Sequence, residues 1–418
     1  MKILLATPFF PPDRGGVPHH VSLLARELRR LGEEVAIFRR TGDEGGPQYS
    51  AGRSVWEGIP VHAVRYRWEG LRAFEDLYEN EPMERALAAV LEAERPDVVH
   101  FHHLTGFGLG ALAAARRAGA QVLLTLHDFW LGCPRSQRIT RELDRCPTID
   151  RTKCVPCLRA LYGEWIPEGN EGIERLRRHD ERLREALAGV DRLVTPSRFV
   201  ADVYSEDTGI PRDRFTSIPV GLDPAPFEGI ARRPADVFRI AYAGTLLPSK
   251  GAHVLLDALR HLPADRVRID VHGEVVPWFE ERDYFGALRS RVRPGDPIHF
   301  TGPYDPPELP ALLADADALV VPSVWFEAYS ITVREGWLAG LPVVASRLGG
   351  MEEAIEDGAT GLLFPPGDSE RLGRALHRLL DDPSLRARLA SAPKRVATSS
   401  ETARALLALY SEPKESRP

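Results

Sequence analysis

Two glutamates, Glu327 and Glu335, lie eight positions apart in the stretch PSVWFEAYSITVREGWLAGLPVVAS, residues 322–346, between two apolar runs. Paired carboxylates are the usual acid/base set for cleaving a bond between sugars, and such a pair needs its carboxyls roughly 5 to 9.5 Å apart. On a single helix, eight residues would separate the two side chains by about 80° around the axis and by about 12 Å along it. Glutamates placed in that way do not form a close catalytic pair.

The other arrangement puts Glu327 in a loop after a strand, with a helix that begins near Ser330 and carries Glu335 in its first turns. A helix N-terminus presents unpaired backbone N–H groups, which suit a phosphate; here they would be those of Ala328, Tyr329, Ser330 and Ile331. The two carboxylates would then reach two different hydroxyl-bearing parts of one ligand. A capped helix with a solvated glutamate fits the same pattern, so the pattern alone leaves both interpretations open.

Other loops in this half of the chain also follow apolar strands. The segment AYAGTLLPSKG contains Gly244 and Thr245 and brings Lys250 to the start of the next helix, and the strands that end in HGE (272–274) and FTGPYD (300–305) finish in turn residues. In open parallel sheets, ligands bind outside the carboxyl ends of the strands. One ligand could therefore contact all of these loops.

Strand-like apolar runs alternate with helical patterns along the chain, which predicts an α/β fold with parallel sheets covered on both faces. At 418 residues the chain is long enough for two domains. Residues 223–237 are rich in Pro, Gly and Arg without periodicity, which indicates a linker. The expected helices include residues 81–94, 108–118, 172–188, 251–260, 281–292, 307–314, 331–340, 351–357 and 400–412.

The composition excludes some classes of function. Apolar residues make up 43% and charged residues 27% of the chain, and the formal charge of −6 gives no global reason to expect nucleic-acid binding. No apolar run reaches the length of a membrane span, and MKILLATPFFPP lacks the pattern of a secretory signal. We therefore expect a cytoplasmic protein, with peripheral contact at the inner membrane face left open.

At this point the sequence resembles a known family, the retaining glycosyltransferases of family 4 (glycosyl transferases group 1), which have the GT-B fold. The resemblance rests on the two glutamates with seven residues between them, on GLPVVASRLGGMEEAIEDGATGLLFPPGD after them, and on the Gly15–Gly16 loop, LHD (126–128), PS (196–197) and GTLLPSKG. It implies two Rossmann-like domains facing each other across a cleft. Residues 1–225 would form the acceptor-side domain, 226–395 the nucleotide-sugar-binding domain, and 396–418 a helix that crosses back to the first domain.

The resemblance also implies roles for single residues in the transfer of a sugar from a UDP- or GDP-linked donor. Glu335 resembles the acid that holds the donor ribose, Glu327 the acid beside the donor sugar, and Lys250 the cation that neutralises the diphosphate. Gly16 lies in the loop whose amides approach that diphosphate, and His127 stands where the family has a residue beside the transferred sugar. The acceptor would be a saccharide, a lipid-linked molecule or a small molecule.

One position departs from the family pattern. Members often carry Arg after the glycine of the first strand in the second domain, whereas here Thr245 follows Gly244. The leaving diphosphate gains negative charge, which a metal, cations or oriented amides must stabilise. DADA (315–318) is the nearest approach to a metal-binding Asp-x-Asp, and we interpret its acids as boundary residues between a helix and a strand. Lys250 together with helix N-termini could stabilise this charge, so we expect a reaction without a catalytic metal. The resemblance to the family implies that the anomeric configuration is retained.

Histidines close two strands of the first half. His102 and His103 end VHFHH, where either one packs in the core and the other faces solvent, or both lie on the acceptor side. His127 and Asp128 follow QVLLTL and precede FW. A histidine beside aromatic rings could stack on a sugar and hydrogen-bond to it.

All four cysteines lie close together, with the spacing C-x12-C-x7-C-x2-C: Cys133, Cys146, Cys154 and Cys157. This spacing permits a structural zinc site, which we favour, or an iron–sulfur cluster. Two disulfides or plain thiols remain open, and a redox-active pair is disfavoured because no clear helix follows the last C-x2-C. HDFW followed by a Cys-rich insert (133–157) also resembles a subgroup of the family, which favours a structural role.

Two rival functions remain at this stage. A nucleotide-sugar epimerase of GT-B architecture would release nucleotide without an acceptor, and a degenerate sugar-nucleotide-binding protein would catalyse nothing. A nicotinamide dehydrogenase is disfavoured because the first loop lacks G-x-G-x-x-G. The sequence does not indicate an oligomeric state.

Overall fold

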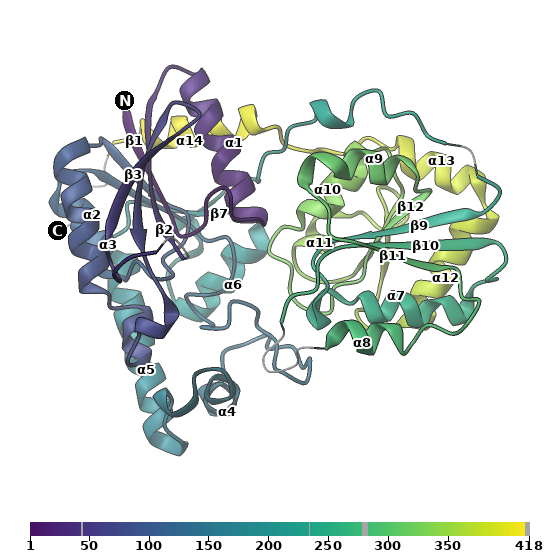
Figure 1. Cartoon of the computed structure of the whole chain (residues 1–418), viewed down its shortest axis with the longest axis horizontal. Helices are drawn as coiled ribbons and strands as arrows, with labels where there is room; N and C mark the ends of the chain where they lie inside the picture. The colour runs from purple at the N-terminus through teal and green to yellow at the C-terminus, as the bar shows by residue number, and fades with distance from the viewer. Residues whose placement is uncertain (43–44, 234, 278–282, 414–418) are drawn as a thin grey trace. The chain divides into compact units, whose positions relative to one another are not determined.

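The computed structural model describes residues 1–42, 45–233, 235–277 and 283–413. The chain divides into two compact units, which we describe separately (Figure 1). The N-terminal unit comprises Met1–Gln137, Thr148–Leu222 and Ala397–Pro418. The C-terminal unit comprises Arg138–Pro147 and Asp223–Val396. Each unit is an α/β domain, as the alternation of strands and helices predicts.

The N-terminal unit is built on an eight-stranded sheet in the order β3-β4-β2-β1-β5-β6-β7-β8. Every neighbouring pair is parallel except β3 with β4, which is antiparallel. The direction of strand order reverses between β1 and β5, so this is the point where ligands bind in such sheets. The strands are β1 (Lys2–Thr7), β2 (Glu34–Thr41), β3 (Ala51–Trp56), β4 (Ile59–Arg65), β5 (Val98–Phe101), β6 (Gln121–Thr125), β7 (Arg192–Thr195) and β8 (Phe215–Ser217).

The helices of the N-terminal unit bury apolar side chains, most of them against the sheet, while α4 packs against α5. Their bounds are α1 (Gly16–Arg30), α2 (Glu81–Glu94), α3 (Gly110–Arg117), α4 (Arg151–Tyr162), α5 (Gly169–Ala188), α6 (Arg198–Thr208) and α14 (Ser399–Tyr410). Apolar residues of α1 and of α14 share one buried core with β1 and β2, so the last helix of the chain belongs to this unit (Figure 1).

The C-terminal unit contains a six-stranded sheet, all parallel, in the order β11-β10-β9-β12-β13-β14. Strand order reverses between β9 and β12, which is the arrangement of a nucleotide-binding Rossmann sheet. The strands are β9 (Phe238–Ala243), β10 (Val267–His272), β11 (Ile298–Gly302), β12 (Ala318–Val321), β13 (Val343–Ser346) and β14 (Leu362–Phe364). The helices are α7 (Ala252–Ala258), α8 (Tyr284–Arg289), α9 (Leu309–Ala314), α10 (Ile331–Leu338), α11 (Gly350–Ala354), α12 (Ser369–Asp381) and α13 (Pro383–Ser391).

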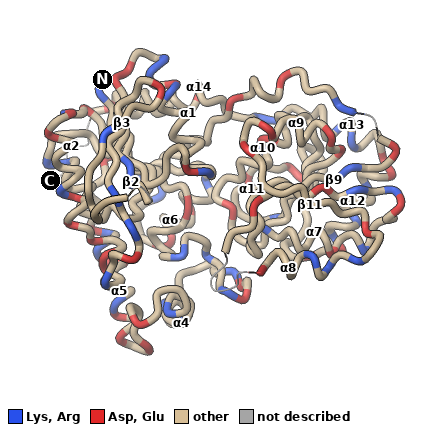
Figure 2. The backbone as a smooth tube through the Cα atoms, viewed as in Figure 1, with Lys and Arg blue, Asp and Glu red and all other residues tan. Residues whose placement is uncertain are grey.

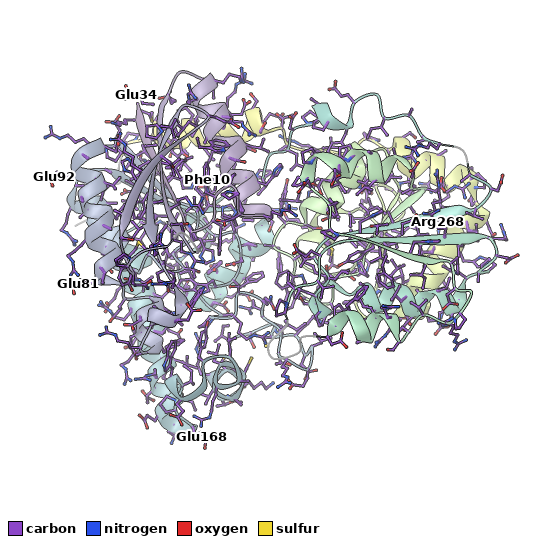
Figure 3. All side chains as sticks on the ribbon, in the orientation of Figure 1. Phe10, Glu34, Glu81, Glu92, Glu168 and Arg268 are labelled. Carbon is purple, nitrogen blue, oxygen red and sulfur yellow. The ribbon has the colours of Figure 1, made fainter. Side chains whose placement is uncertain are left out.

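Charged residues lie mainly outside the two cores. Figure 2 shows Lys or Arg and Asp or Glu interspersed along α2 and α5. Figure 3 shows Glu81 and Glu92 pointing away from α2, while Phe10, which is 1% exposed, lies inside the N-terminal unit. This pattern of apolar interior and mixed-charge exterior is ordinary for a globular protein.

The sequence-based helices agree with the structure except in a few places. The helix expected over 281–292 begins at Tyr284, and residues 281–282 lie outside the described part of the chain. The expectation that no clear helix follows the final C-x2-C was wrong, because Cys154 and Cys157 lie within α4, which is capped by Asp150, contains Pro156 and continues to Tyr162. The prediction missed this helix because an internal proline usually ends one. None of the described helices is long and apolar enough to cross a membrane.

Candidate active site

Glu327 is a buried carboxylate of the C-terminal unit with three side-chain hydrogen-bond donors around it. It lies in the loop after β12, is 7% exposed, and its Oε1 accepts hydrogen bonds from Lys250 Nζ (2.8 Å), Ser323 Oγ (2.7 Å) and Trp325 Nε1 (2.8 Å). Burial alone would raise the pKa of Glu327, but the charge of Lys250 and the three hydrogen bonds outweigh it and hold the pKa below its ordinary value. Glu327 is therefore a buried, ionised group.

Lys250 comes from the loop after β9, on the other side of the point where strand order reverses. Its ammonium lies 4.8 Å from the centre of the Trp325 ring, and its side chain is 29% exposed. The next residue, Gly251, has φ +73°, and a Cβ there would lie 2.0 Å from the carbonyl oxygen of Pro322. Only glycine permits this approach, which brings the lysine loop against the glutamate loop.

The loop before α10 is fixed by a buried arginine. Ser330 has φ +59°, a left-handed conformation that is strained for a residue with a side chain. The Arg334 guanidinium is 7% exposed, donates to the carbonyl oxygens of Tyr329 and Ser330, and lies 3.9 Å from the centre of the Tyr329 ring. These contacts hold the first backbone N–H groups of α10 in place.

Gly350, the second glycine of the LGG sequence, contacts the loop that carries Glu327. The Gly350 N–H donates to the carbonyl oxygen of Glu327 at 2.7 Å. A Cβ at Gly350 would lie 2.6 Å from the carbonyl oxygen of Ala328. Glycine is therefore required at position 350, because two backbone segments approach closely there. This contact fixes the position of the loop that carries Glu327.

Glu335 lies on α10 in different surroundings from Glu327. It is partly buried and donates or accepts no side-chain hydrogen bond with any described residue. Burial raises the pKa of Glu335 to about 7. Its negative charge in turn adds to the effect of burial in raising the pKa of Tyr304, which follows β11. Glu335 is thus a carboxyl group with unused hydrogen-bonding capacity near the carboxyl edge of the sheet.

Two further sequence expectations concern charge on the diphosphate side. Thr245 is exposed, and it follows Gly244, whose N–H donates to the carbonyl oxygen of His272 at 3.0 Å. The acids of DADA are bound by an arginine: Arg239 lies 3.5 Å from Asp315 and 3.6 Å from Asp317. These two acids are therefore occupied at the junction of α9 and β12, as their interpretation as boundary residues predicts.

In the N-terminal unit, three histidines converge next to the strands β5 and β6. His102 is fully buried, its Nδ1 lies 3.1 Å from Nε2 of His127, and His20 of α1 packs edge-on against both rings. Burial lowers the pKa of His20 to about 4 and lowers those of His102 and His127 well below the ordinary value. Their ligand atoms lie within 4.8 Å of one another, the one such group among the described His, Cys, Asp and Glu residues, so three neutral imidazoles could face one cation or hydrogen-bond a sugar.

A fourth histidine connects this group to the end of the chain. His100 is fully buried, and its two ring nitrogens lie 2.7 Å from Thr125 Oγ1 and 2.7 Å from the Tyr410 hydroxyl of α14. Burial lowers the pKa of His100 to about 3. The neighbouring His102 has an Nε2 that is buried without a hydrogen-bond partner among the described residues. The histidines are therefore neutral and packed around one another.

His103 is fixed in one tautomer. The Thr105 N–H donates to its Nδ1 at 3.0 Å, so Nδ1 carries no proton and the Nε2–H donates to Asp128 Oδ2 at 3.2 Å. Asp128 also accepts from the backbone N–H of Trp130 at 2.9 Å. The expectation that one of His102 and His103 faces solvent was wrong, because His103 is only 7% exposed. His103 has φ +152°, a conformation rare for a side-chain-bearing residue, and turns back beneath the Trp130 ring.

Gly16 is the first residue of α1 and is exposed, next to Gly15 with φ +129°. No other residue type adopts that conformation readily, so the glycine pair sets the direction in which α1 begins. No side chain caps this N-terminus, where Gly16 and Val17 carry the first backbone N–H groups.

The cysteines are thiols and are partly buried. Cys154 and Cys157 have arginines beside them, with Arg151 Nη1 3.7 Å from one sulfur and Arg135 Nη1 3.5 Å from the other. The sulfurs of the N-terminal unit, those of Cys133, Cys154 and Cys157, do not meet as a ligand set among the described residues. Cys146 lies in the other unit, on the short segment whose Ile139 packs into the C-terminal core. A structural zinc site therefore remains a prediction.

Comparison with known proteins gives the family. Residues 14–226 match the family model described as glycosyltransferase family 4, and residues 228–396 match that of glycosyl transferases group 1. The chain is 28% identical over 421 residues to glycogen synthase of Mycobacterium tuberculosis, which covers 96% of this chain and 91% of the relative. It is 27% identical over 391 residues to a D-inositol 3-phosphate glycosyltransferase of Arthrobacter sp., with 90% and 84% covered.

The structure of Anabaena HepE in complex with UDP and glucose superposes with a TM-score of 0.68 at 19% identity, covering 99% of this chain and 100% of that one. Two Rossmann-like units of this topology define a GT-B fold, and with the matched models they define a nucleotide-sugar-dependent glycosyltransferase. The chain belongs to glycosyltransferase family 4.

Several site residues were not found by sequence reasoning. Ser323 and Trp325 stand next to Glu327 in the sequence, so their proximity was a usable signal. His20 lies in the helical pattern VPHHVSLL, where it is indistinguishable from a core position. Arg334 is one of 54 basic residues and carried no signal at all.

Proposed function

We propose that the protein transfers a sugar, with retention of configuration and without a catalytic metal, from a UDP- or GDP-linked donor to a saccharide, lipid-linked or small-molecule acceptor. The observation that carries this proposal is the Lys250–Glu327 pair at 2.8 Å, at the point where strand order reverses. A cation and a carboxylate held together there match the needs of a diphosphate and of a sugar hydroxyl respectively.

The proposed donor site uses the loops after β9 and β12. Glu335, with its unused hydrogen-bonding capacity, accepts from the ribose hydroxyls, and Glu327 accepts from a hydroxyl of the donor sugar. Lys250 and the N–H groups of residues 328–331 neutralise the diphosphate as the bond to the sugar breaks. In the N-terminal unit, Gly16 contributes amides, and His127 lies beside the transferred sugar with His102, His103 and Asp128 on the acceptor side.

Retention follows in this proposal from attack on the same face that the diphosphate leaves. The leaving phosphate oxygen takes the acceptor proton, so no enzyme carboxylate forms a bond to the sugar. Glu327, which is buried and accepts three hydrogen bonds, suits an electrostatic role better than a nucleophilic one.

A donor screen tests the proposal. Purified protein is incubated with UDP- and GDP-sugars, with and without a panel of saccharide acceptors, and free nucleotide and product are measured. We expect nucleotide release that depends on acceptor, a product whose anomeric configuration by NMR equals that of the donor, and unchanged turnover after chelation with EDTA. Equal nucleotide release without any acceptor would instead favour the epimerase.

Metal analysis addresses the cysteines separately. Zinc bound in proportion to protein, and lost in a Cys154→Ser variant, would support a structural site. Protein without zinc or iron would leave thiols at these positions.

A further inference from the structure

The N-terminal unit contains a cavity of about 710 Å³ at the carboxyl ends of three parallel strands, β1, β2 and β4. Its lining includes Phe9, Arg39, Arg40, Tyr66, Arg67 and Trp68, none of which belongs to the site described above. The Phe9 ring packs edge-on against His103, with ring centres 6.3 Å apart. The cavity therefore adjoins the histidine group.

Arg40 is the central residue of this cavity. It is 9% exposed, and its guanidinium carbon lies 4.8 Å from the centre of the Phe9 ring, 5.1 Å from that of Tyr66 and 5.3 Å from that of Trp68. The rings surround the guanidinium but do not accept hydrogen bonds from its N–H groups, because a guanidinium donates hydrogen bonds in its own plane. Its Nε is buried with no hydrogen-bond partner among the described residues.

Arg40 forms no ion pair with a described residue; burial lowers its pKa, and the charge of Asp13 offsets this only in part. The nearby Arg39 pairs with Asp13 at 2.9 Å and also donates to the carbonyl oxygen of Pro11, so the Asp13 carboxylate is already engaged. Glu69, the other acid in the lining, forms no ion pair with Arg40 or Arg67 among the described residues. A buried cation without a counter-ion is costly, and an anionic ligand would remove that cost.

One more polar group beside Arg40 lacks a partner. The Tyr66 hydroxyl is buried without a hydrogen bond to a described residue. Trp68, which also lines the cavity, is 44% exposed, which is unusual for a large apolar ring. Buried donors without partners, next to aromatic rings of which one is exposed, suit a molecule with an anionic end and a sugar-like body.

We propose that this cavity binds the acceptor, and that the acceptor carries an anionic oxygen group, phosphate or carboxylate, held by Arg40. Phe9 and Trp68 contact the rest of the acceptor, and the Tyr66 hydroxyl donates to the anionic group. The inference rests on the proposed function, because it names the class of acceptor.

Calorimetric titration of the full chain tests it, with glucose 6-phosphate, glucuronate, glucose and inorganic phosphate as probes. We expect at least one anionic sugar to bind about tenfold or more tightly than glucose, the usual strength of a charge-assisted contact. Preference for glucose 6-phosphate with inorganic phosphate as a competitor assigns phosphate, and preference for glucuronate assigns carboxylate. Equal binding of all sugars, or no binding of any anionic probe, overturns the proposal.

The variants are Arg40→Gln, Arg40→Lys and a matched control, Arg53→Gln. Arg53 lies on β3 with its side chain 69% exposed, so the control removes the same charge from the same unit away from the cavity. We expect Arg40→Gln to abolish the preference for the anionic probe, Arg40→Lys to retain part of it, and Arg53→Gln to retain all of it. A preference that survives in Arg40→Gln overturns the proposal.

Titration of the same samples with UDP and GDP separates the two proposals. Nucleotide binding that persists in Arg40→Gln shows a folded protein with an intact donor site, so a lost preference is then a property of the cavity. Absence of nucleotide binding in the wild type would contradict the proposed function instead.

Discussion

In the C-terminal unit, Glu327 is buried and charged, because Lys250, Ser323 and Trp325 all donate to one of its oxygens. In the N-terminal unit, His100 and His102 are fully buried and neutral, because burial there meets no compensating charge. Burial disfavours the charged form of an ionisable group in both units. In the C-terminal unit a cation and hydrogen bonds compensate for this effect, and at these histidines of the N-terminal unit no charge of a described residue does. The difference fits the two tasks proposed for them: neutralising a diphosphate needs fixed charge, whereas contacting a sugar needs neutral donors and acceptors.

The largest expected effect comes from removing the fixed charge. Lys250→Ala leaves Glu327 buried without its cation, which costs about 3 kcal/mol in the free energy of unfolding, and it removes charge stabilisation worth about 10²–10³ in turnover. Urea unfolding and steady-state kinetics measure the two. A Lys250→Ala, Glu327→Gln double variant should recover much of the stability but none of the turnover. Wild-type turnover in Lys250→Ala would contradict the assigned role.

Acid should affect the two units in opposite directions. His20 has a folded pKa of about 4 against 6.5 unfolded, so the unfolded chain binds the proton first and stability is lost as pH falls below 6.5. This one residue should lower the free energy of unfolding by about 2 kcal/mol between pH 7 and pH 5. Glu335 has a raised folded pKa of about 7, so its contribution grows as pH falls from 7 and is lost as pH rises through 7.

Hydrogen exchange read by mass spectrometry resolves this contrast peptide by peptide. In His20→Phe, protection from exchange in α1 and β5 should decrease less on acidification than in the wild type. In Glu335→Gln, protection in α10 should increase less on acidification. If acid changed protection in the same direction in both units, the proposed contrast between the two units would be wrong.

Nucleotide affinity should depend on the protonation of Glu335. A carboxylate accepts from ribose hydroxyls and a protonated carboxyl does so poorly, so affinity for UDP or GDP should fall about tenfold from pH 8 to pH 6. Glu335→Gln should bind weakly at both pH values, with no slope between them. Calorimetry measures this, and an unchanged affinity in the variant would overturn the assignment to the ribose.

The smallest effect should come from one hydrogen bond of the Glu327 network. Trp325→Phe keeps a ring beneath Lys250 but removes the Nε1–H that donates to Glu327 at 2.8 Å. A hydrogen bond to a charged group is worth about 1.5 kcal/mol, so stability should fall by that amount and turnover by a few fold. A loss as large as that of Lys250→Ala would mean that ring packing, not charge, dominates the site.

The sequence predicted what depends on position along the chain. Strand-loop-helix order places Lys250 and Glu327 at one sheet edge, and the helix after Glu327 begins at Ile331, next to the predicted start near Ser330. It did not predict contacts that form only in three dimensions. The burial of His103 results from a backbone turn with positive φ, and the rings around Arg40 come from separate segments, Phe9 after β1 and Tyr66 after β4. Helix α4 was not predicted because it contains Pro156.

The return of α14 to the first unit has a consequence for synthesis on the ribosome. Ala403, Leu406, Leu409 and Tyr410 fill the core of the N-terminal unit, and Tyr410 hydrogen-bonds to His100. The C-terminal unit has nearly all its residues in one run, 223–396, and needs no segment that follows it to complete its core. The N-terminal unit, most of which is made first, therefore cannot complete its core or the surroundings of His100 until residues 399–410 are available, so a chain cut short before α14 has an incomplete N-terminal unit.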